Sequence, residues 1–175
     1  SRVVTTTRSH ARQLVERYPE QGEAKFVTIP NGYDEADFRN LPSAPGEGTG
    51  KLRVLHAGFV HSHYRDPRPL FRGLEELVAT GELDPAELEM VFLGTEGAAF
   101  ARELAAELTA SPLAGSVRFA PQVPYRAALA EMAASDLLLV LHASADTRYT
   151  VPAKLYEYLR AGGPVLSLNQ PGAIS

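Results

Sequence analysis

Two charged residues near the end of the chain have the types and spacing needed to hold a phosphorylated ligand. Lys154 and Glu157 lie three residues apart in the stretch VPAKLYEYLRAGGPVLSL, residues 151–168. If a helix begins at the proline, residues at this spacing share one face. The lysine could then neutralise a phosphate, and the carboxylate could accept hydrogen bonds from two adjacent ribose hydroxyls. The same side chains could instead form a solvent-facing ion pair, and the stretch alone leaves both interpretations open.

A third charged residue, Arg65, stands just before a second predicted helix start at Pro67. Proline is favoured in the first turn of a helix, so both Pro67 and Pro152 indicate helix starts. The free N–H groups and positive dipole ends of such helices attract anions. A guanidinium would add a fixed charge with bidentate geometry, although a loop arginine can also be simply solvated. Arg65 is therefore a candidate phosphate ligand.

Histidines raise the separate question of a metal site. His61 and His63 would point to opposite sides of an extended chain, His56 lies apart from them, and the chain has no cysteine. Zinc sites usually need three or four convergent ligands, so we expect no metal and treat these histidines as packing or rim residues. The Walker and G-x-G-x-x-G spacings are also missing, which does not favour an ATPase or a hydride-transfer enzyme.

The elements that must position these residues alternate between apolar strands and amphipathic helices. The helices are indicated by apolar residues that recur at helical spacing, such as Leu70, Leu74 and Leu77. Strands that are apolar on both faces and separated by helices are typical of a parallel sheet covered on both sides, so we predict an α/β fold with a doubly wound parallel sheet. The predicted strands are 2–6, 25–29, 52–57, 88–93, 116–119, 136–141 and 164–168.

Ligands of such a sheet bind beyond the carboxyl ends of its strands. The loops expected there are rich in glycine or polar residues and span 58–66, 94–97, 121–124 and 142–150. Arg65 and the helix start at Pro152 fall on or beside these loops. The topology rule therefore predicts that the candidate ligands share one edge of the sheet.

Composition indicates a globular protein with ample core material. The 175 residues are 45% hydrophobic with a net charge of -4, which provides no basic footprint for nucleic acid. The lack of cysteine is compatible with a reducing cytosol, and no apolar run approaches the ~20 residues of a membrane helix. Residues 41–50 read as a linker between segments 1–40 and 51–175. We expect the chain to be a piece of a longer protein.

The order of motifs resembles the nucleotide-sugar half of a GT-B glycosyltransferase of the large retaining group similar to family 4. TTTRSHARQLVERYPEQGEAKFVTIPNGYDEADF is similar to the segment that leaves the N-terminal, acceptor-side domain of that family. LHAGFVHSHYRDPRPLFRGLEEL looks like the first strand, glycine turn and helix of its C-terminal domain, and VPAKLYEYLRAGGPVL like its EAMA.G.PV helix. The resemblance covers nearly the whole chain, with the C-terminal domain cut short, and implies a Rossmann-like fold preceded by a short piece of the acceptor-side domain.

The resemblance also implies a role for each matching residue. Glu157 would hold the ribose hydroxyls, while Arg65 and Lys154 would be the catalytic counter-charges of the diphosphate. The turn at Gly58 would let the backbone approach the diphosphate. The turn at Gln122 and Val123 would contact the base, chiefly through backbone groups. The residues implied for nucleotide binding are Gly58, Phe59, Arg65, Gln122, Val123, Ala153, Lys154 and Glu157.

The activity implied is transfer of a sugar from a UDP- or GDP-type donor, with retention of configuration and without a cofactor or metal. The acceptor would be a sugar, a lipid-linked molecule or a small molecule, in cytoplasmic polysaccharide or glycoconjugate synthesis. We expect membrane contact to come from outside this chain and the chain alone to transfer little sugar.

Two departures from the family pattern leave the sugar open. Tyr149 replaces a sugar-binding glutamate, and HYRDP replaces the usual R...KG phosphate pair. The sequence is therefore also compatible with two other functions, a nucleotide-sugar 2-epimerase of the same architecture and a non-catalytic nucleotide-binding domain.

Overall fold

The computed structural model describes residues 1–44, 50–142 and 148–169. Its main sheet has five parallel strands in the order β5-β4-β3-β6-β7. This order confirms the predicted α/β fold, and the strand bounds differ from the predicted ones by no more than one residue at either end. The strands are β3 (Leu52–Ala57), β4 (Leu88–Leu93), β5 (Val117–Ala120), β6 (Leu137–His142) and β7 (Val165–Asn169).

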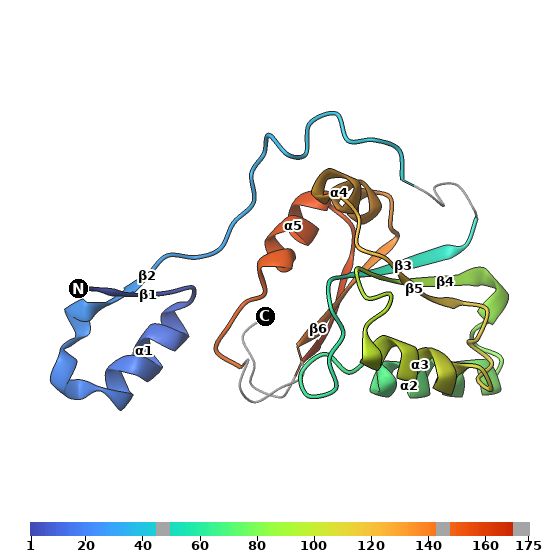
Figure 1. The fold of residues 1–175 in the computed structure, drawn as a ribbon, viewed down its shortest axis with the longest axis horizontal. Helices are drawn as coiled ribbons and strands as arrows, with labels where there is room; N and C mark the ends of the chain where they lie inside the picture. The colour runs from blue at the N-terminus through green and yellow to red at the C-terminus, as the bar shows by residue number, and fades with distance from the viewer. Residues whose placement is uncertain (45–49, 143–147, 170–175) are drawn as a thin grey trace.

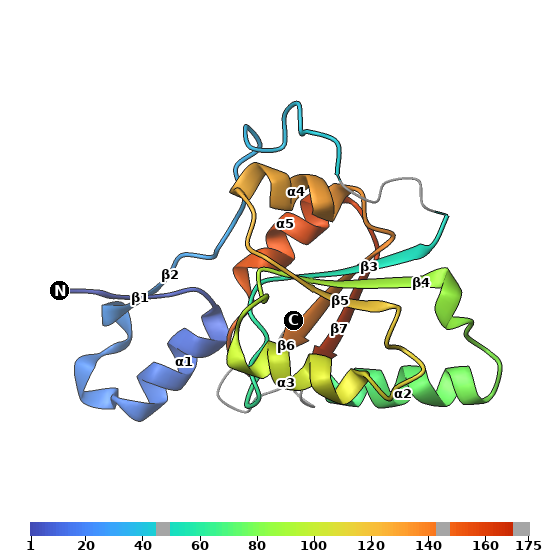
Figure 2. The ribbon, with the colours of Figure 1, turned by 45° about the vertical axis from the view of Figure 1, so that its right-hand side comes forward.

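Helices cover both faces of this sheet, as Figures 1 and 2 show. One face carries α2 (Arg68–Ala79) and α3 (Ala99–Leu108), and the other carries α4 (Tyr125–Ala133) and α5 (Ala153–Ala161). A short 3-10 turn, η3 (Pro85–Glu87), leads into β4. Within the described ranges, no helix is long and apolar enough to cross a membrane.

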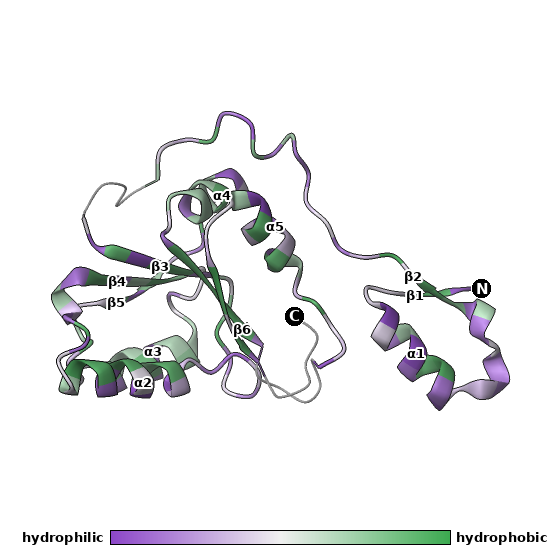
Figure 3. Cartoon of the chain, turned by 180° about the vertical axis from the view of Figure 1, so that it is seen from behind, coloured by the Kyte–Doolittle hydropathy of each residue, from purple (hydrophilic) through white to green (hydrophobic). Residues whose placement is uncertain are grey.

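Alternating side chains along the strands explain the two layers. In β6, Leu139 and Leu141 pack into the α2/α3 layer, whereas Leu138 and Val140 pack into the α4/α5 layer. Successive side chains of a strand point to opposite faces, so an uninterrupted apolar strand builds two cores at once. Figure 3 shows the result as strongly hydrophobic strands inside more polar helices.

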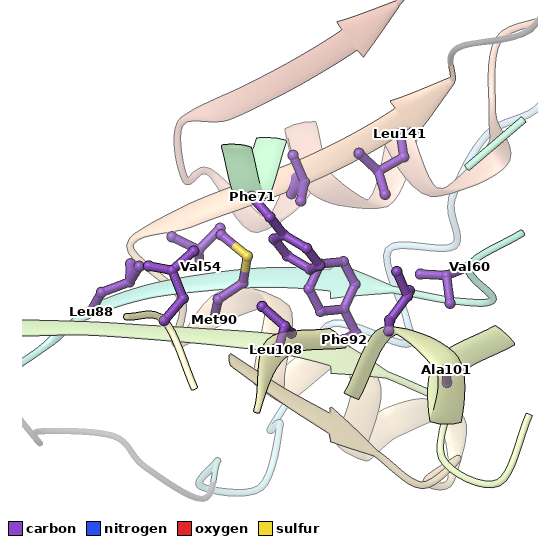
Figure 4. Close-up of a cluster of buried hydrophobic side chains, with 12 residues drawn as sticks. Val54, Val60, Phe71, Leu88, Met90, Phe92, Ala101, Leu108 and Leu141 are labelled. Carbon is purple, nitrogen blue, oxygen red and sulfur yellow. The ribbon is translucent and has the colours of Figure 1, made fainter. Parts of the chain in front are cut away.

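The α2/α3 layer packs against β3 and β4, the strands whose ends carry the site, and holds them in place. Phe71 of α2 meets Phe92 of β4 edge to face, with ring centroids 5.7 Å apart (Figure 4). Both rings are buried. Truncation of such a ring usually costs about 3–5 kcal/mol, so β4 and its neighbour β3 form a firm base for the loops that follow them.

The first 28 residues form a separate small unit (Figure 1). Strands β1 (Val3–Thr5) and β2 (Phe26–Thr28) pair in parallel and are connected by α1 (Arg8–Arg17) and two 3-10 turns, η1 (Pro19–Gln21) and η2 (Glu23–Lys25). The hydroxyl of Thr7 accepts a hydrogen bond from the His10 N–H and so caps α1.

The following segment returns to the main domain and lies over α4 and α5. Phe38 and Ala44 are buried there, and Phe38 belongs to the core cluster beneath these helices. The Arg160 side chain of α5 forms an ion pair with Glu35, and Arg126 of α4 donates hydrogen bonds to carbonyls between residues 37 and 40. Residues 45–49 of the predicted linker lie outside the described residues.

Candidate functional site

The candidate site lies where the sheet order reverses. From β3 the chain first builds β4 and β5 on one side, and then crosses to build β6 and β7 on the other. Strand β3 pairs with β4 along its whole length, but its register with β6 covers Val54 and Leu55. The carboxyl ends of β3 and β6 therefore flank the topological switch point, which is the usual ligand position in an open α/β sheet.

Side chains provide hydrogen bonds for the end of β3 beyond this pairing. The Tyr158 hydroxyl accepts a hydrogen bond of 2.8 Å from the Ala57 N–H, and the His56 Nδ1 lies 2.9 Å from the Leu139 carbonyl oxygen. Tyr158 and His56 are both fully buried. An unsatisfied buried N–H costs about 1–3 kcal/mol, so the tyrosine from α5 fixes the strand end that leads into Gly58.

Position 58 requires a glycine for two reasons, which are its backbone conformation and the close approach of Lys154. Its φ is +113°, a conformation that L side chains rarely adopt, and its N–H donates a 2.8 Å hydrogen bond to the Leu93 carbonyl. A Cβ at this position would lie 3.0 Å from the Lys154 Nζ. The glycine therefore lets the lysine of α5 approach the turn after β3 closely.

Lys154 lies between positive and neutral groups. Its Nζ is 3.4 Å from the His56 Nε2. Burial, followed by the positive charge of Arg65, lowers the pKa of Lys154 to about 7, although Glu157 opposes the shift. Among the described residues, no ion pair connects Lys154 or Arg65 to a carboxylate. Two cations whose charges act on each other, and which have no carboxylate partner among the described residues, create a positive potential that favours an anion.

Glu157 turns to another helix rather than to Lys154. The Tyr125 hydroxyl of α4 donates a 2.8 Å hydrogen bond to the Glu157 Oε1. Partial burial, followed by this hydrogen bond, raises the pKa of Tyr125 to about 12. The sequence reasoning missed Tyr125, because the contact joins positions 32 residues apart. The solvent-facing ion pair of Lys154 with Glu157 is thus not formed among the described residues.

A cavity of about 230 Å³ opens beside Gly58. It is framed by the ends of β3 and β4, the loop after β5 and the start of α4, and its walls are mainly apolar. It brings together four of the residues expected to bind nucleotide, Gly58 and Phe59 from the first turn and Gln122 and Val123 from the later one. The complete lining is Ala57, Gly58, Phe59, Leu93, Gly94, Gln122, Val123, Tyr125 and Ala128.

Arg65 closes a tight loop after β3. Its N–H donates a 2.9 Å hydrogen bond to the His61 carbonyl, and the His61 N–H donates one of 3.3 Å in return. The His61 ring stacks on Tyr64 at a centroid distance of 4.2 Å, and its Nδ1 accepts a hydrogen bond from the His63 N–H. These contacts account for the histidine-rich loop. In the part of the chain that the structure describes, no three His, Cys, Asp or Glu side chains cluster to hold a metal.

The start of α5 completes the rim. Pro152 occupies its N-cap position, Ala153 is exposed, and no side chain within the described residues caps this end. The Leu155 N–H donates a 3.0 Å hydrogen bond to the Pro152 carbonyl, whereas the N–H groups of Ala153 and Lys154 have no partner among the described residues and are favourable partners for an anion. Just before it, the Tyr149 carbonyl accepts a hydrogen bond from the Thr7 hydroxyl, so the residue that departs from the family pattern contacts the N-terminal unit. Residues 143–147 of the predicted loop 142–150 lie outside the described residues.

Comparison with known proteins identifies the fold. No family model and no curated protein matches this chain. Among solved structures, Alr3699/HepE of Anabaena in complex with UDP-glucose is 17% identical with a TM-score of 0.66, covering 95% of this chain and 44% of that one. A glycosyltransferase from Rickettsia africae is 16% identical with a TM-score of 0.73, at the same coverage of 95% and 44%.

A third similar structure is a UDP-forming α,α-trehalose-phosphate synthase from Burkholderia vietnamiensis, 13% identical with a TM-score of 0.65, covering 97% of this chain and 44% of that one. The chain therefore spans less than half the length of the structures it resembles. At these identities the likeness establishes the fold, and the main sheet with its helices has the Rossmann-like architecture of one half of a GT-B glycosyltransferase.

Proposed function

We propose that this chain is the sugar-donor-binding part of a retaining glycosyltransferase, similar to family 4, that uses a nucleoside diphosphate sugar. The observation that carries the proposal is the approach of the Lys154 ammonium to the backbone of Gly58 at the switch point of the sheet. Arg65 adds a second cation whose charge acts on Lys154. A diphosphate is the ligand whose charge and size match two cations beside a free helix start.

The remaining contacts follow from the same placement. Glu157 would hold the ribose hydroxyls, which would share or replace its hydrogen bond with Tyr125. The base would lie in the apolar cavity, against Phe59 and the turn at Gln122 and Val123. HepE has been crystallised with UDP and UDP-glucose, which supports uracil as the first base to test.

In the reaction, the bond from the anomeric carbon of the sugar to the diphosphate breaks, a bond from that carbon to the acceptor oxygen forms as the acceptor hydroxyl loses its proton, and negative charge grows on the departing diphosphate. Lys154, Arg65 and the N–H groups at Ala153 would stabilise that charge without a metal. The acceptor would be a sugar, a lipid-linked molecule or a small molecule, bound chiefly by the N-terminal domain of which residues 1–40 would be the tail. Residues 41–50 would be the linker and 51–175 the C-terminal domain, in a cytoplasmic enzyme. The chain alone would then bind the sugar donor but transfer little sugar. No feature of the described residues favours a 2-epimerase.

Calorimetric titration with UDP, GDP and ADP tests this proposal. We expect one nucleotide to bind, and both Glu157→Ala and Arg65→Ala to weaken it roughly tenfold or more, because hydrogen bonds to charged groups contribute about 1.5–3 kcal/mol. Glu76→Ala and Arg72→Ala, on the exposed side of α2, are matched controls that should bind like wild type. A folded chain that binds none of the three nucleotides would contradict the proposal.

A further inference from the structure

His56 is a fully buried polar side chain beside the site that the proposed ligand contacts do not use. Its Nδ1 lies 2.9 Å from the Leu139 carbonyl oxygen. A carbonyl can accept but not donate a hydrogen bond, so we assign the imidazole hydrogen to Nδ1, which leaves a lone pair on Nε2. Burial, followed by the charge of Lys154, lowers the pKa of His56 to about 3 against the opposing contacts with the backbone of Leu139 and Phe59, so the ring stays neutral. His56 is therefore a fixed hydrogen-bond acceptor.

That lone pair faces Lys154. The Lys154 Nζ lies 3.4 Å from Nε2, a long hydrogen bond in which the lysine must be the donor. A lysine has a flexible four-carbon stem and would readily turn to a carboxylate on its own helix. Glu157 lies one turn along α5 and accepts a hydrogen bond from Tyr125, while the Lys154 ammonium lies against Gly58 instead. The imidazole of His56 is a polar group within hydrogen-bonding distance of the Lys154 Nζ in this rotamer.

We propose that His56 is a positioning residue, whose neutral imidazole holds Lys154 against Gly58 and away from Glu157, so that the lysine charge forms where the diphosphate binds. This inference rests on the proposed function for the identity of the ligand. It differs from it in assigning to His56 a role that requires no contact with the nucleotide.

The charged groups around Lys154 predict how the arrangement responds to pH. His56 faces it from β3, Arg65 from the following loop and Glu157 from α5, while Tyr125 of α4 acts through Glu157. Because burial and Arg65 lower the pKa of Lys154 to about 7, the amine is partly neutral near neutral pH. A bound diphosphate favours the charged form, so binding takes up a proton. Affinity should therefore fall as the pH rises above about 7, by up to about tenfold per pH unit.

Two substitutions separate positioning from packing. His56→Asn keeps an amide N–H close to the place of Nδ1, for the Leu139 carbonyl, but removes the acceptor at Nε2. His56→Gln reaches the position of Nε2 with an amide oxygen and should restore the acceptor. Freed from the imidazole, Lys154 in His56→Asn should turn to Glu157 and solvent and titrate closer to the ordinary lysine value of about 10.4.

Nuclear magnetic resonance of the ligand-free 175-residue chain, carrying lysine labelled with carbon-13 at Cε, measures this directly. The lysines are Lys25, Lys51 and Lys154, and Lys154→Met assigns the last. We expect a Lys154 titration midpoint near neutrality in wild type, a rise of at least about one pH unit in His56→Asn, and a return towards wild type in His56→Gln. An unchanged midpoint in His56→Asn would overturn the inference.

A measurement on wild type covers the case in which His56→Asn does not fold. Nitrogen-15 imidazole spectra should show the Nδ1–H tautomer of His56, with an Nε2 resonance that shifts at the same midpoint as Lys154 although the ring itself does not titrate. An Nε2–H tautomer, or an Nε2 resonance insensitive to Lys154, would refute the positioning role.

The pH profile of ligand binding then connects the pair to function. UDP-glucose, GDP-glucose and ADP-glucose are suitable probes, because their terminal phosphate is esterified to the sugar and lacks the ionisation with a pKa of about 6. From about pH 7 to pH 8, wild-type affinity should fall several-fold, whereas Lys154→Met and His56→Asn should show a flat profile. A wild-type profile without this fall would count against the inference. If none of the probes binds at all, the proposed function fails, and the two spectroscopic titrations still decide the role of His56.

Discussion

The starts of α2 and α5 are similar in sequence and opposite in electrostatics. Each helix has a proline as its N-cap at the same edge of the sheet and a cation in its first turn, Arg68 or Lys154. Arg68 forms ion pairs with Asp66, Glu103 and Glu107, and these carboxylates raise its pKa. Lys154 contacts an imidazole and a glycine backbone, and its pKa is lowered.

This difference is the one that we expect between a structural cation and a cation that binds a ligand. The charge of Arg68 is neutralised by α3, so it ties the two helices of one layer together. Among the described residues, no carboxylate pairs with Lys154, and its burial carries a cost in desolvation that the fold tolerates. A protein retains such a cation most readily where a ligand supplies the missing negative charge.

Lys154→Met should have the largest effect among the substitutions that test this difference between α2 and α5. The substitution keeps the side-chain length and removes the charge, so nucleotide affinity should fall roughly 10- to 100-fold, since a hydrogen bond to a charged group contributes about 1.5–3 kcal/mol. The free energy of unfolding should not decrease, because a poorly solvated cation is lost. Lys51→Met, at an exposed position before β3, is the control. Calorimetry and urea denaturation measure the two quantities, and unaltered affinity would contradict our assignment.

Tyr158→Phe tests the support beneath Gly58. Loss of the hydroxyl leaves the Ala57 N–H without its acceptor, and the free energy of unfolding should fall by about 1–3 kcal/mol. Tyr156→Phe, in the same helix but only half-buried, should change it by less than about 0.5 kcal/mol. Equal stability of the two variants in urea would show that the hydroxyl does not hold the strand end.

Because His56 is buried in its neutral form, we predict that the free energy of unfolding depends on pH. Its pKa of about 3 in the folded state lies below the ordinary value, so between these values the unfolded chain binds a proton that the native chain does not. The free energy of unfolding should therefore fall as the pH decreases, by about 2 kcal/mol from pH 7 to pH 5. His56→Asn should lack this contribution. Parallel urea titrations of both proteins at the two pH values measure it. If the free energy of unfolding changed equally between pH 7 and pH 5 in both proteins, the burial of a neutral imidazole would be contradicted.

Arg68→Met should have the smallest effect. Its ion pairs are largely exposed, and such pairs contribute about 0.2–1 kcal/mol each, so the free energy of unfolding should fall by about 1 kcal/mol. Nucleotide affinity should stay at the wild-type value. A marked loss of affinity in this variant would mean that α2, and not α5, provides the cation of the site.

The sequence predicted the elements of the main domain well because their signals are local. The apolar runs of β3 and β4 and the spacing of Leu70, Leu74 and Leu77 in α2 require no knowledge of the partner elements. Gly58 and Lys154 could also be assigned to one edge of the sheet, because the rule for parallel sheets fixes where ligands bind.

The contacts within the site could not be predicted in this way. Glu157 accepts a hydrogen bond from Tyr125, and the Lys154 Nζ lies 3.4 Å from the His56 Nε2, through contacts between distant segments. The partner of a charged side chain depends on the direction in which that side chain points at the switch point. This direction is set by the packing of β3, α4 and α5 against one another. The chemical types of the site residues were therefore readable, but their pairing was not.

A crystal structure of this chain with the nucleoside diphosphate it binds would test the central claim most directly. We predict a phosphate oxygen within about 3 Å of the Lys154 Nζ, beside the Gly58 backbone, with the ribose hydroxyls on Glu157. A nucleotide bound elsewhere, with Lys154 turned to form an ion pair with Glu157, would contradict the account.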